Sequence, residues 1–371
     1  MDWSGKQKRI LTGGERADEL YTPERGYAFE ENELPHHHLI QSDTHAAFAN
    51  WREQATKLAG SKRDRDETAS PNKDALISAW KRTLFYGGWE HTSSRDEITF
   101  NLQTRNLFID LRIPRTRKDT IAGSKSSLLD LNKEELRCYA RQHVFSGYTK
   151  VDTHGSDLLC TRHHCIDWNF VGIGRTRPNK WYAELQQEGS TQEVQTWKEW
   201  AFAKDERGQH YYCEHWQRLP QGGSTPFLAL RKPKGSKQDG IIVIVGNHFS
   251  YVLARDLSQL SEEKRNEYSK HGSLGGLVDA ALDQNDLDTA RAYLSTQGGH
   301  GIISKDGWIV DCAIEPWKEG KPFWTASDSI LLKGDTMADC KVELHNGVWE
   351  VFDTSLTSKE EISKLLRSGR H

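Results

Sequence analysis

Hydrophobic and polar residues alternate in a series of short segments between residues 80 and 220. Residues 97–104 read EITFNLQT, residues 107–113 read LFIDLRI, and residues 211–219 read YYCEHWQRL. A period of two residues is typical of β-strands with one buried face. Turn-forming residues separate the segments, and such short connections favour antiparallel pairing. The pattern therefore predicts a curved antiparallel sheet, as in a barrel or a sandwich.

The same patterns predict further elements along the chain. Strands are expected at 143–151, 157–168, 181–187, 192–202, 209–218, 300–305, 308–315, 328–333, 340–345 and 348–353. Residues 239–256 are long and apolar enough for one strand, or for two strands broken at Gly246. Helices are expected at 44–59, 75–84, 131–142, 261–269, 274–282, 286–294 and 358–366. Asn132 can cap the helix that follows it, and Thr357 and Glu360 have capping-box spacing.

Changes of composition along the chain predict three parts. Residues 1–74 are polar and turn-rich, with one amphipathic helix, and residues 75–220 form a first β unit. Residues 221–371 form a second β unit, with a helical insert at about 258–296 and a carboxyl-terminal helix. A boundary is expected at 220–240, where QGGSTP and KPKGSKQDG are typical of loops. The fold class is therefore mainly β, with peripheral helices.

Several short aromatic motifs resemble a known family. Gly88-Trp89 at the start of the predicted barrel is similar to the lipocalin or calycin group. Four other motifs resemble the little-characterised Hri1-type proteins of bacteria and fungi: LFIDLRIP, Trp200-Ala201-Phe202, Glu214-x-Trp216 and DGIIVIVG. The resemblance covers roughly residues 80–355 and implies two lipocalin-like antiparallel β-barrel units packed together. It implies no established chemistry.

Charge and hydropathy narrow the classes of partner. Lysine and arginine number 50 against 53 aspartates and glutamates, with both signs interspersed, so no nucleic-acid partner is expected. The longest apolar run, residues 241–245, is far too short to span a bilayer. The amino terminus, MDWSGKQKRI, lacks the apolar stretch of a secretory signal. We therefore expect no membrane partner, a cytoplasmic protein, and six cysteines that are mainly reduced.

Strand alternation places chemically useful side chains of three strands on shared faces. The three sets are Phe108, Asp110 and Arg112; Cys160, Arg162, His164, Ile166 and Trp168; and Tyr212, Glu214 and Trp216. If all three faces point into one barrel, they form a mostly aromatic cavity with a few charges, which is typical of small-molecule sites. The expected ligand-binding residues are then Trp89, Asp110, Arg112, Arg162, Trp168 and Trp216.

Two of these side chains are candidates for acid–base catalysis. His164 could exchange a proton near neutral pH, and Glu214 could orient it or act as a base. Arg112 or Arg162 could hold a carboxylate or an enolate through two parallel hydrogen bonds. The alternative is structural: Asp110–Arg112 and Glu214–Arg162 would be ion pairs on the outside of the sheet, and the tryptophans would fill a core.

The sequence predicts no cofactor and no metal site. Cys160 and Cys165 flank two histidines, but a separation of five places them on opposite faces of a regular strand. Gly172-x-Gly174 lacks the third glycine of a dinucleotide-binding loop, and Pro178 blocks the helix that such a loop needs. The chain contains no Walker A loop and no GxSxG elbow.

Three hypotheses for function follow. The first is capture of a small apolar or aromatic metabolite inside the first barrel. The second is a cofactor-independent isomerase, cyclase or lyase acting on a secondary metabolite, which requires His164, Glu214 and an arginine within hydrogen-bonding distance. The third is an interaction or scaffold protein that exposes an apolar patch on the 44–59 helix.

A further prediction concerns the surroundings of Arg112. If both faces of the strand at 107–113 are buried, Arg112 needs Asp110 or Glu214 as a partner, because an unpaired buried charge costs several kcal/mol.

Overall fold

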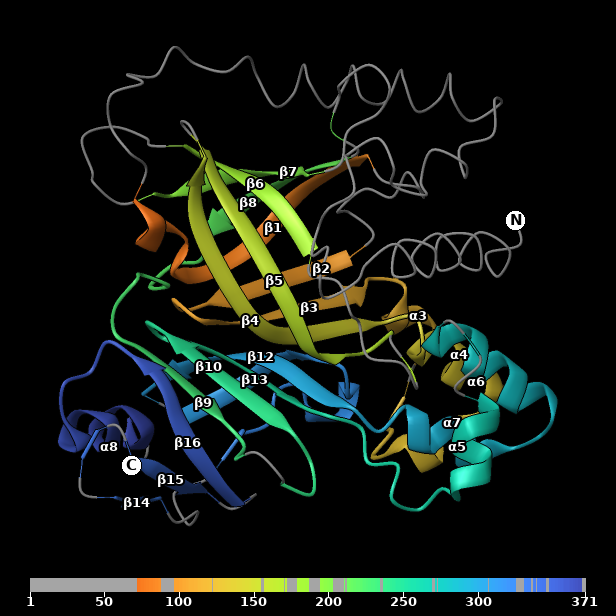
Figure 1. The fold of residues 1–371 in the computed structure, drawn as a ribbon. Coiled ribbons are helices and arrows are strands. Elements are labelled where there is room, and N and C mark those ends of the chain that lie inside the picture. Colours follow the sequence, from red (N-terminus) through yellow and green to blue (C-terminus); the bar gives the residue numbers. More distant parts are fainter. Residues whose placement is uncertain are drawn as a thin grey trace.

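Two β units, a closed barrel and an eight-stranded sheet, form the body of the molecule (Figure 1). The computed structural model describes residues 72–87, 97–121, 123–154, 157–169, 171, 179–186, 194–202, 210, 212–233, 236–268, 271, 273–305, 307–324, 330–334, 336–337, 339–344 and 347–368. The helix expected at 44–59 lies outside these residues, as does Trp89.

The barrel is an up-and-down meander in which each strand pairs with the next and β8 pairs back to β1. Its strands are β1 (Ser78–Gly87), β2 (Glu97–Gln103), β3 (Leu107–Pro114), β4 (His143–His154), β5 (Asp157–Asp167), β6 (Asn179–Gln186), β7 (Thr196–Ala201) and β8 (Tyr212–Arg218). Closure satisfies the backbone hydrogen bonds that an edge strand would leave open. An eight-stranded barrel is just wide enough for its side chains or for one small ligand.

The second unit is an antiparallel sheet in the order β13-β12-β11-β10-β9-β16-β15-β14. Its strands are β9 (Phe227–Arg231), β10 (Gly240–Val245), β11 (His248–Leu253), β12 (Gln297–Ser304), β13 (Gly307–Ala313), β14 (Leu331–Lys333), β15 (Lys341–Leu344) and β16 (Gly347–Thr354). The prediction of a mainly β fold with two antiparallel units and peripheral helices is confirmed. The sequence analysis expected two barrels, and this is wrong for the second unit. The first unit is a closed barrel, whereas the second is a sheet with β13 and β14 at its two ends.

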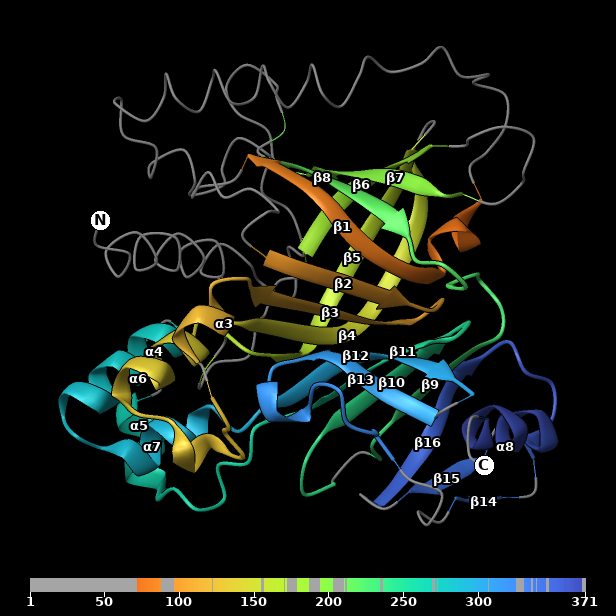
Figure 2. The ribbon, with the colours of Figure 1, turned by 180° about the vertical axis from the view of Figure 1, so that it is seen from behind.

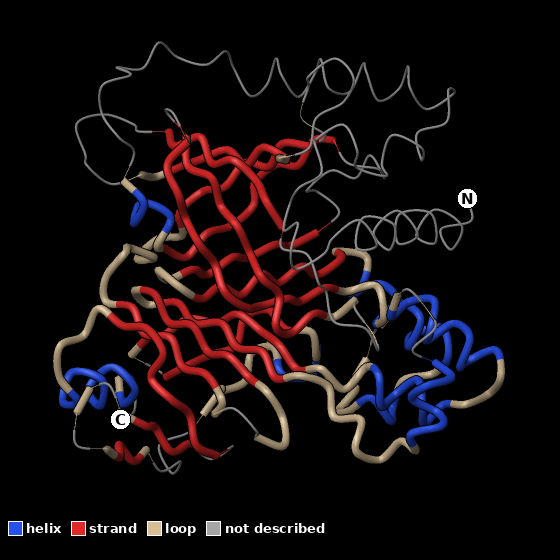
Figure 3. The backbone as a smooth tube through the Cα atoms, in the orientation of Figure 1, coloured by secondary structure: helices blue, strands red, loops and turns tan. Residues whose placement is uncertain are grey.

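Helices lie at the periphery of both units (Figures 2 and 3). They are η3 (Lys73–Leu76), α3 (Arg117–Thr120), η4 (Leu128–Asp130), α4 (Lys133–Tyr139), α5 (Glu262–Tyr268), α6 (Leu274–Asp283), α7 (Leu287–Tyr293), η5 (Pro316–Lys318) and α8 (Lys359–Arg367). The helices α3 to α7 gather on one side of the molecule, whereas α8 lies beside the second sheet. None of the described helices has the length and apolar character needed to cross a bilayer.

Capping chemistry sets where two of these helices begin. Asn132 accepts a hydrogen bond from the backbone N–H of Glu135 at 3.0 Å, so the predicted cap of α4 is confirmed. At α8 the cap is Ser358, which accepts from the N–H of Glu361 at 3.2 Å. The cap therefore lies one residue after the expected Thr357, and the side chain of Glu361 accepts from the backbone N–H of Thr357 at 2.7 Å.

Two segments differ from the sequence-based assignment. A helix was expected at 75–84, but β1 starts at Ser78 after a single 3-10 turn. Ala79 packs outside the barrel and Trp80 inside it, and apolar residues on both faces of a strand mimic helical spacing. The strand β9 was missed because its five residues lie between the two loops expected at the boundary, yet it pairs with both β10 and β16.

The barrel packs against the second sheet through the outer face of β2, β3 and β4. Leu107 and Leu111 on this face share one apolar core with Val243 of β10. On the opposite face of β3, Phe108 and Asp110 are fully buried inside the barrel. Both faces of β3 are therefore buried, which is the condition under which Arg112 was expected to need a partner.

Candidate functional site

Tryptophan side chains fill one end of the barrel interior. Trp197 stacks between Trp181 and Trp216, with ring centroids 5.2 Å and 5.6 Å apart, and we call these three the tryptophan stack. Trp80 meets Trp197 edge-on at 5.9 Å. The indole N–H of Trp80 donates to the carbonyl of Leu76 at 2.9 Å, so η3 is attached to this end of the barrel. Trp216, expected near a ligand, lies in this stack.

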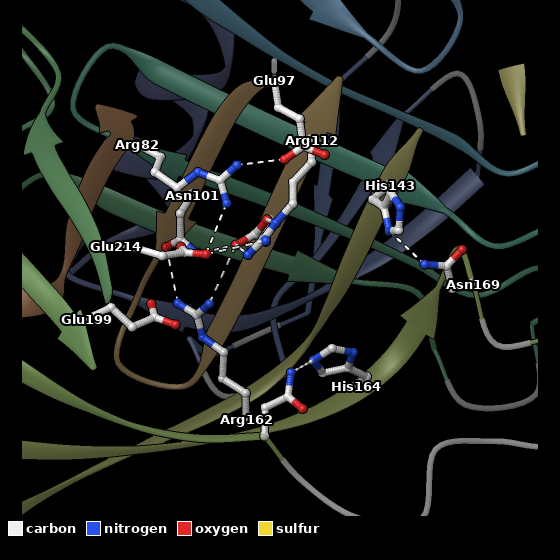
Figure 4. A network of polar contacts seen from close by, with 12 residues as sticks. Arg82, Glu97, Asn101, Arg112, His143, Arg162, His164, Asn169, Glu199 and Glu214 are labelled. Carbon is white, nitrogen blue, oxygen red and sulfur yellow. Dashed lines mark hydrogen bonds and ion pairs between the residues drawn. The ribbon is translucent and has the colours of Figure 1, made fainter. Parts of the chain in front are cut away.

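Two arginines in the middle of the barrel are joined by one carboxylate (Figure 4). Arg82 donates from Nη1 to Oε1 of Glu214 at 3.0 Å and from Nη2 to Oε2 of Glu97 at 2.6 Å. Arg112 donates from Nε to Oδ1 of Asp110 at 2.8 Å and from Nη1 to the same Glu214 oxygen at 3.5 Å. The partners expected for Arg112 are therefore the ones found.

A third arginine, Arg162, is held mainly by neutral amides. Its Nη2 donates to Oε1 of Gln103 at 2.7 Å and to Oδ1 of Asn101 at 3.2 Å. The nearest carboxylate oxygen, on Asp110, lies 3.8 Å from Nη1. Its guanidinium carbon sits 4.2 Å from the ring centroid of Phe108. We call Arg82, Arg112 and Arg162, together with Glu97, Asp110 and Glu214, the arginine–carboxylate network.

The network fixes the charge of its carboxylates. Burial acts to raise the pKa of Asp110, but the nearby Arg112 and Arg162 outweigh it and lower that pKa. Burial also acts to raise the pKa of Glu97, but Arg82 and Arg112 outweigh it, so this pKa is lowered as well. Both groups are therefore ionised at neutral pH.

Glu199, on β7, behaves in the opposite way. Burial, and then repulsion from Glu214, raise the pKa of Glu199 to about 8. The two are cross-strand partners on β7 and β8, and Oε1 of Glu199 accepts from the hydroxyl of Tyr212 at 2.8 Å. Glu199 therefore keeps its proton at pH 7. The three guanidinium groups of the arginine–carboxylate network are then matched by its three carboxylate groups, and the protonated Glu199 adds no further charge.

Several buried polar atoms inside the barrel have no hydrogen-bond partner among the described residues. They are Nε1 of Trp197 and Trp216, Nε of Arg82 and Arg162, Oε2 of Glu214, and the hydroxyls of Thr99 and Thr149. We call them the unpartnered atoms. Trp216 and Glu214 are two residues apart on one face of β8, so the unpartnered atoms of these two residues lie where the tryptophan stack meets the network. Leaving such an atom unpaired costs roughly 1–3 kcal/mol, so each needs an explanation.

His164 lies apart from Glu214, toward the other end of the barrel. Its Nδ1 is 2.6 Å from Oδ2 of Asp167, its Nε2 is 3.2 Å from the amide of Asn179, and its ring stacks on Phe145. In Figure 4, His164 and Glu214 lie on different sides of Arg162. The structure therefore pairs His164 with Asp167 and Glu214 with arginines.

Trp168 is outside the barrel interior, contrary to expectation. The pairing of β4 with β5 shifts by one residue at Cys165, which is a β-bulge. A bulge reverses the alternation of faces beyond it. His164 therefore faces inward, whereas Trp168 packs in the core shared with the second sheet and donates from Nε1 to the carbonyl of Ala140 at 3.1 Å.

The structural alternative for the charged residues is only partly right. Asp110 and Arg112 do form an ion pair, but inside the barrel, where Asp110 is 0% exposed. Glu214 pairs with Arg82 and Arg112, not with Arg162 as was expected. These contacts bring Asp110, Arg112 and Arg162 together, as the predicted ligand site requires.

Sequence reasoning missed three residues of this interior. Arg82 was assigned to a helix, and Glu97 was not considered. Glu199 lies two residues after Trp197 in the segment TWKEWA of β7, so strand alternation was the signal that could have placed it inward.

The thiols and imidazoles do not form a metal centre in the part of the chain that the structure describes. No group of three or more His, Cys, Asp or Glu side chains there is arranged to hold an ion. All six cysteines are free; Cys160 is buried and Cys165 is exposed. Burial raises the pKa of the Cys160 thiol well above its usual value.

Comparisons with known proteins give a distant similarity to a solved structure. No protein-family model matches the chain, and no curated protein matches its sequence. Among solved structures it is similar to the uncharacterized protein YLR301w from Saccharomyces cerevisiae, with 11% identity and a TM-score of 0.43. The match covers 75% of this chain and 99% of that chain.

Proposed function

We propose that the closed barrel binds a small aromatic molecule where the tryptophan stack meets the arginine–carboxylate network. The observation that carries this proposal is the cluster of unpartnered atoms. Ion pairs inside a protein are often no more stabilising than apolar residues of the same volume. A barrel interior that served stability alone would therefore have little use for three buried arginines and for indole N–H groups without acceptors.

The composition of the interior supports the same proposal. Small-molecule sites combine apolar and aromatic walls with a few well-placed polar groups. The tryptophan stack supplies aromatic surface, and the network supplies charged donors and acceptors beside it. The side chains of Arg112 and Glu97 are 23% and 26% exposed whereas Trp216 is 1% exposed, so these two members of the network lie nearer to solvent than the stack does.

The test is to look for a bound molecule in the purified full-length protein. Small-molecule mass spectrometry after denaturation, and calorimetric titration with an uncharged aromatic probe such as 2-naphthol, should both detect binding. Trp216→Phe removes one unpartnered N–H but keeps a ring, and Arg112→Ala removes a guanidinium of the network; both should weaken binding. Trp308→Phe is the control, because Trp308 lies in the second unit and donates to the carbonyl of Ser368. Equal binding by all variants, or no binding by the wild type, would overturn the proposal.

A second candidate function is acid–base catalysis on the bound molecule. The observation that favours it is Glu199, a carboxylic acid whose raised pKa of about 8 lets it hold a proton at neutral pH. Glu199 would donate its proton to a substrate carbonyl oxygen while Oε2 of Glu214 removes the proton from the α-carbon, which gives the enol. The isomerase, cyclase or lyase hypothesis then rests on Glu199 and Glu214, and no longer on His164.

This second candidate has its own experiment. The ketone 2-tetralone is incubated with the protein in deuterated buffer, and loss of the α-proton signal is followed by nuclear magnetic resonance. The wild type should accelerate exchange above the buffer rate, and Glu199→Gln should remove the acceleration. Exchange at the buffer rate with the wild type would exclude proton abstraction from this class of ketone.

A further inference from the structure

We infer that the molecule held in the barrel is an uncharged aromatic compound rich in oxygen acceptors and carrying one hydroxyl donor. This inference rests on the proposed function and names the chemical class of its ligand. Three features of the interior carry it: the occupied arginines, the balanced charge, and the donor and acceptor character of the unpartnered atoms.

The arginines are already engaged by carboxylates and amides of the protein. Arg112 binds both oxygens of Asp110, from Nε at 2.8 Å and from Nη2 at 3.4 Å, and Arg82 joins Glu97 to Glu214. Bidentate pairing is how a guanidinium recognises a carboxylate ligand. A carboxylate or enolate ligand, as first expected for Arg112 or Arg162, would have to displace a side chain that already fills this role.

The charge balance of the network also disfavours ions. A buried charge without a counter-charge costs several kcal/mol. An anionic ligand would add a negative group to an interior in which three guanidinium groups already face three carboxylates. A cationic ligand could be balanced only if Glu199 released its proton, so a cation should expel about one proton on binding. An uncharged ligand needs neither adjustment.

The unpartnered atoms define the hydrogen-bonding pattern of the ligand. The indole N–H groups of Trp197 and Trp216 and the Nε–H groups of Arg82 and Arg162 only donate. Oε2 of Glu214 accepts. The complementary ligand therefore offers several acceptor oxygens, such as carbonyls, and one hydroxyl for the carboxylate. An ammonium ion, which only donates, could satisfy Glu214 but none of the four donors.

The experiment compares probes that share a naphthalene ring and differ in charge. Binding of 2-naphthol, 6-acetyl-2-naphthol, 2-naphthoate and 2-naphthylmethylammonium to the full-length protein is measured by calorimetry at pH 7. We expect 6-acetyl-2-naphthol, which has a hydroxyl and a carbonyl, to bind at least about tenfold more tightly than either ion, a difference of about 1.4 kcal/mol. Trp197→Phe should weaken 6-acetyl-2-naphthol more than 2-naphthol, because it removes a donor for the carbonyl.

The possible outcomes separate the inference from the function on which it rests. Tighter binding of 2-naphthoate, or tighter binding of the ammonium probe with proton release in buffers of different ionisation enthalpy, overturns the inference and leaves a binding barrel. Absence of binding by all four probes, together with no co-purified molecule, overturns the proposed function itself. Equal effects of Trp197→Phe and of the control Trp308→Phe would also overturn the inferred role of the unpartnered atoms.

Discussion

Two glutamates on neighbouring strands have different immediate neighbours, and this difference bears on the proton of Glu199. Glu214 accepts from Arg82 and Arg112, whereas its cross-strand partner Glu199 has a tyrosine hydroxyl and a like charge nearby. In a buried site an opposite charge favours ionisation, and desolvation or a like charge favours the proton. The charge of a residue inside this barrel is therefore set by contacts within a few ångströms.

The proton on Glu199 should make stability depend on pH. Between the ordinary pKa of 4.5 and the raised value of about 8, the folded chain holds a proton that the unfolded chain has released. The free energy of unfolding should therefore fall as pH rises through this range, by at most about 1.4 kcal/mol per pH unit. Urea denaturation at about pH 5, 7 and 9 should show this fall to be smaller in Glu199→Gln. The exposed control Glu263→Gln should follow the wild type. If the free energy of unfolding changed with pH equally in all three proteins, the raised pKa of Glu199 would be contradicted.

Removing an arginine of the network should destabilise the fold strongly. Arg82→Met leaves Glu97 and Glu214 with one partner fewer in a buried site, at a cost of about 3–5 kcal/mol. Adding Glu214→Gln should recover part of the loss, because one unbalanced charge disappears. The control is Lys150→Met, which breaks a surface pair with Asp152 and should cost less than about 1 kcal/mol. Equal losses in chemical denaturation for Arg82→Met and Lys150→Met would refute the buried pairing.

At the scale of the element, the bulge in β5 decides which side chains enter the barrel. A regular strand would put His164 and Trp168 on the same face. Because of the extra residue at Cys165, His164 points into the barrel and Trp168 packs in the outer core. Gly147 faces this bulge on β4, where the backbone of β5 approaches too closely to leave room for a Cβ atom.

That close approach should make Gly147 difficult to replace. A Cβ on Gly147 would collide with the carbonyl oxygen of His163 and lie 2.8 Å from the backbone N of Cys165. Because backbone atoms cannot move aside easily, Gly147→Ala should destabilise the protein by about 1–3 kcal/mol. A Cβ on Gly223 would meet nothing within 4 Å, so Gly223→Ala should be nearly neutral in thermal unfolding. A neutral Gly147→Ala would show that β4 and β5 are spaced as in a regular sheet.

At the scale of the whole molecule, histidines lie where the barrel meets the second sheet. Phe100, on the outer face of β2, stacks on His300 of β12 at 4.0 Å, and His248 of β11 lies 5.3 Å from His300. The Nε2–H of His248 donates to the carbonyl of Pro220 at 2.7 Å, and Asp311 holds Nδ1 of His300 at 2.8 Å. A buried pair of imidazoles in this position should couple the packing of the two units to pH.

We therefore expect acid to destabilise the folded protein through His248. Burial lowers the pKa of His248 below its ordinary value of 6.5, and the nearby His300 acts in the same direction. Below about pH 6.5, His248 binds a proton in the unfolded chain but not in the folded chain. The free energy of unfolding should therefore fall as the pH drops below this value. His248→Gln should reduce this loss in urea denaturation at about pH 5. The exposed His163→Gln is the control, and an unchanged acid sensitivity in His248→Gln would contradict the prediction.

The sequence determined most of the strands, the class of fold and part of the barrel interior. Alternation is a local property with a period of two residues, so it placed Asp110 and Arg112 on one face and Glu214 and Trp216 on another without any knowledge of pairing. The helix cap at Asn132 was equally local, because its hydrogen bond spans three residues.

Only the tertiary structure decided which faces meet and what charge they carry. The closure of β8 onto β1 and the contact of Arg82 with Glu214 join residues that are far apart in the chain. The same is true of the strand order of the second sheet, which ends at β13 and β14. The bulge at Cys165 depends on the register of two paired strands, which no single strand encodes. The proton on Glu199 depends on burial and on Glu214 across the sheet. These properties arise from pairing and desolvation, which are set by the assembled fold.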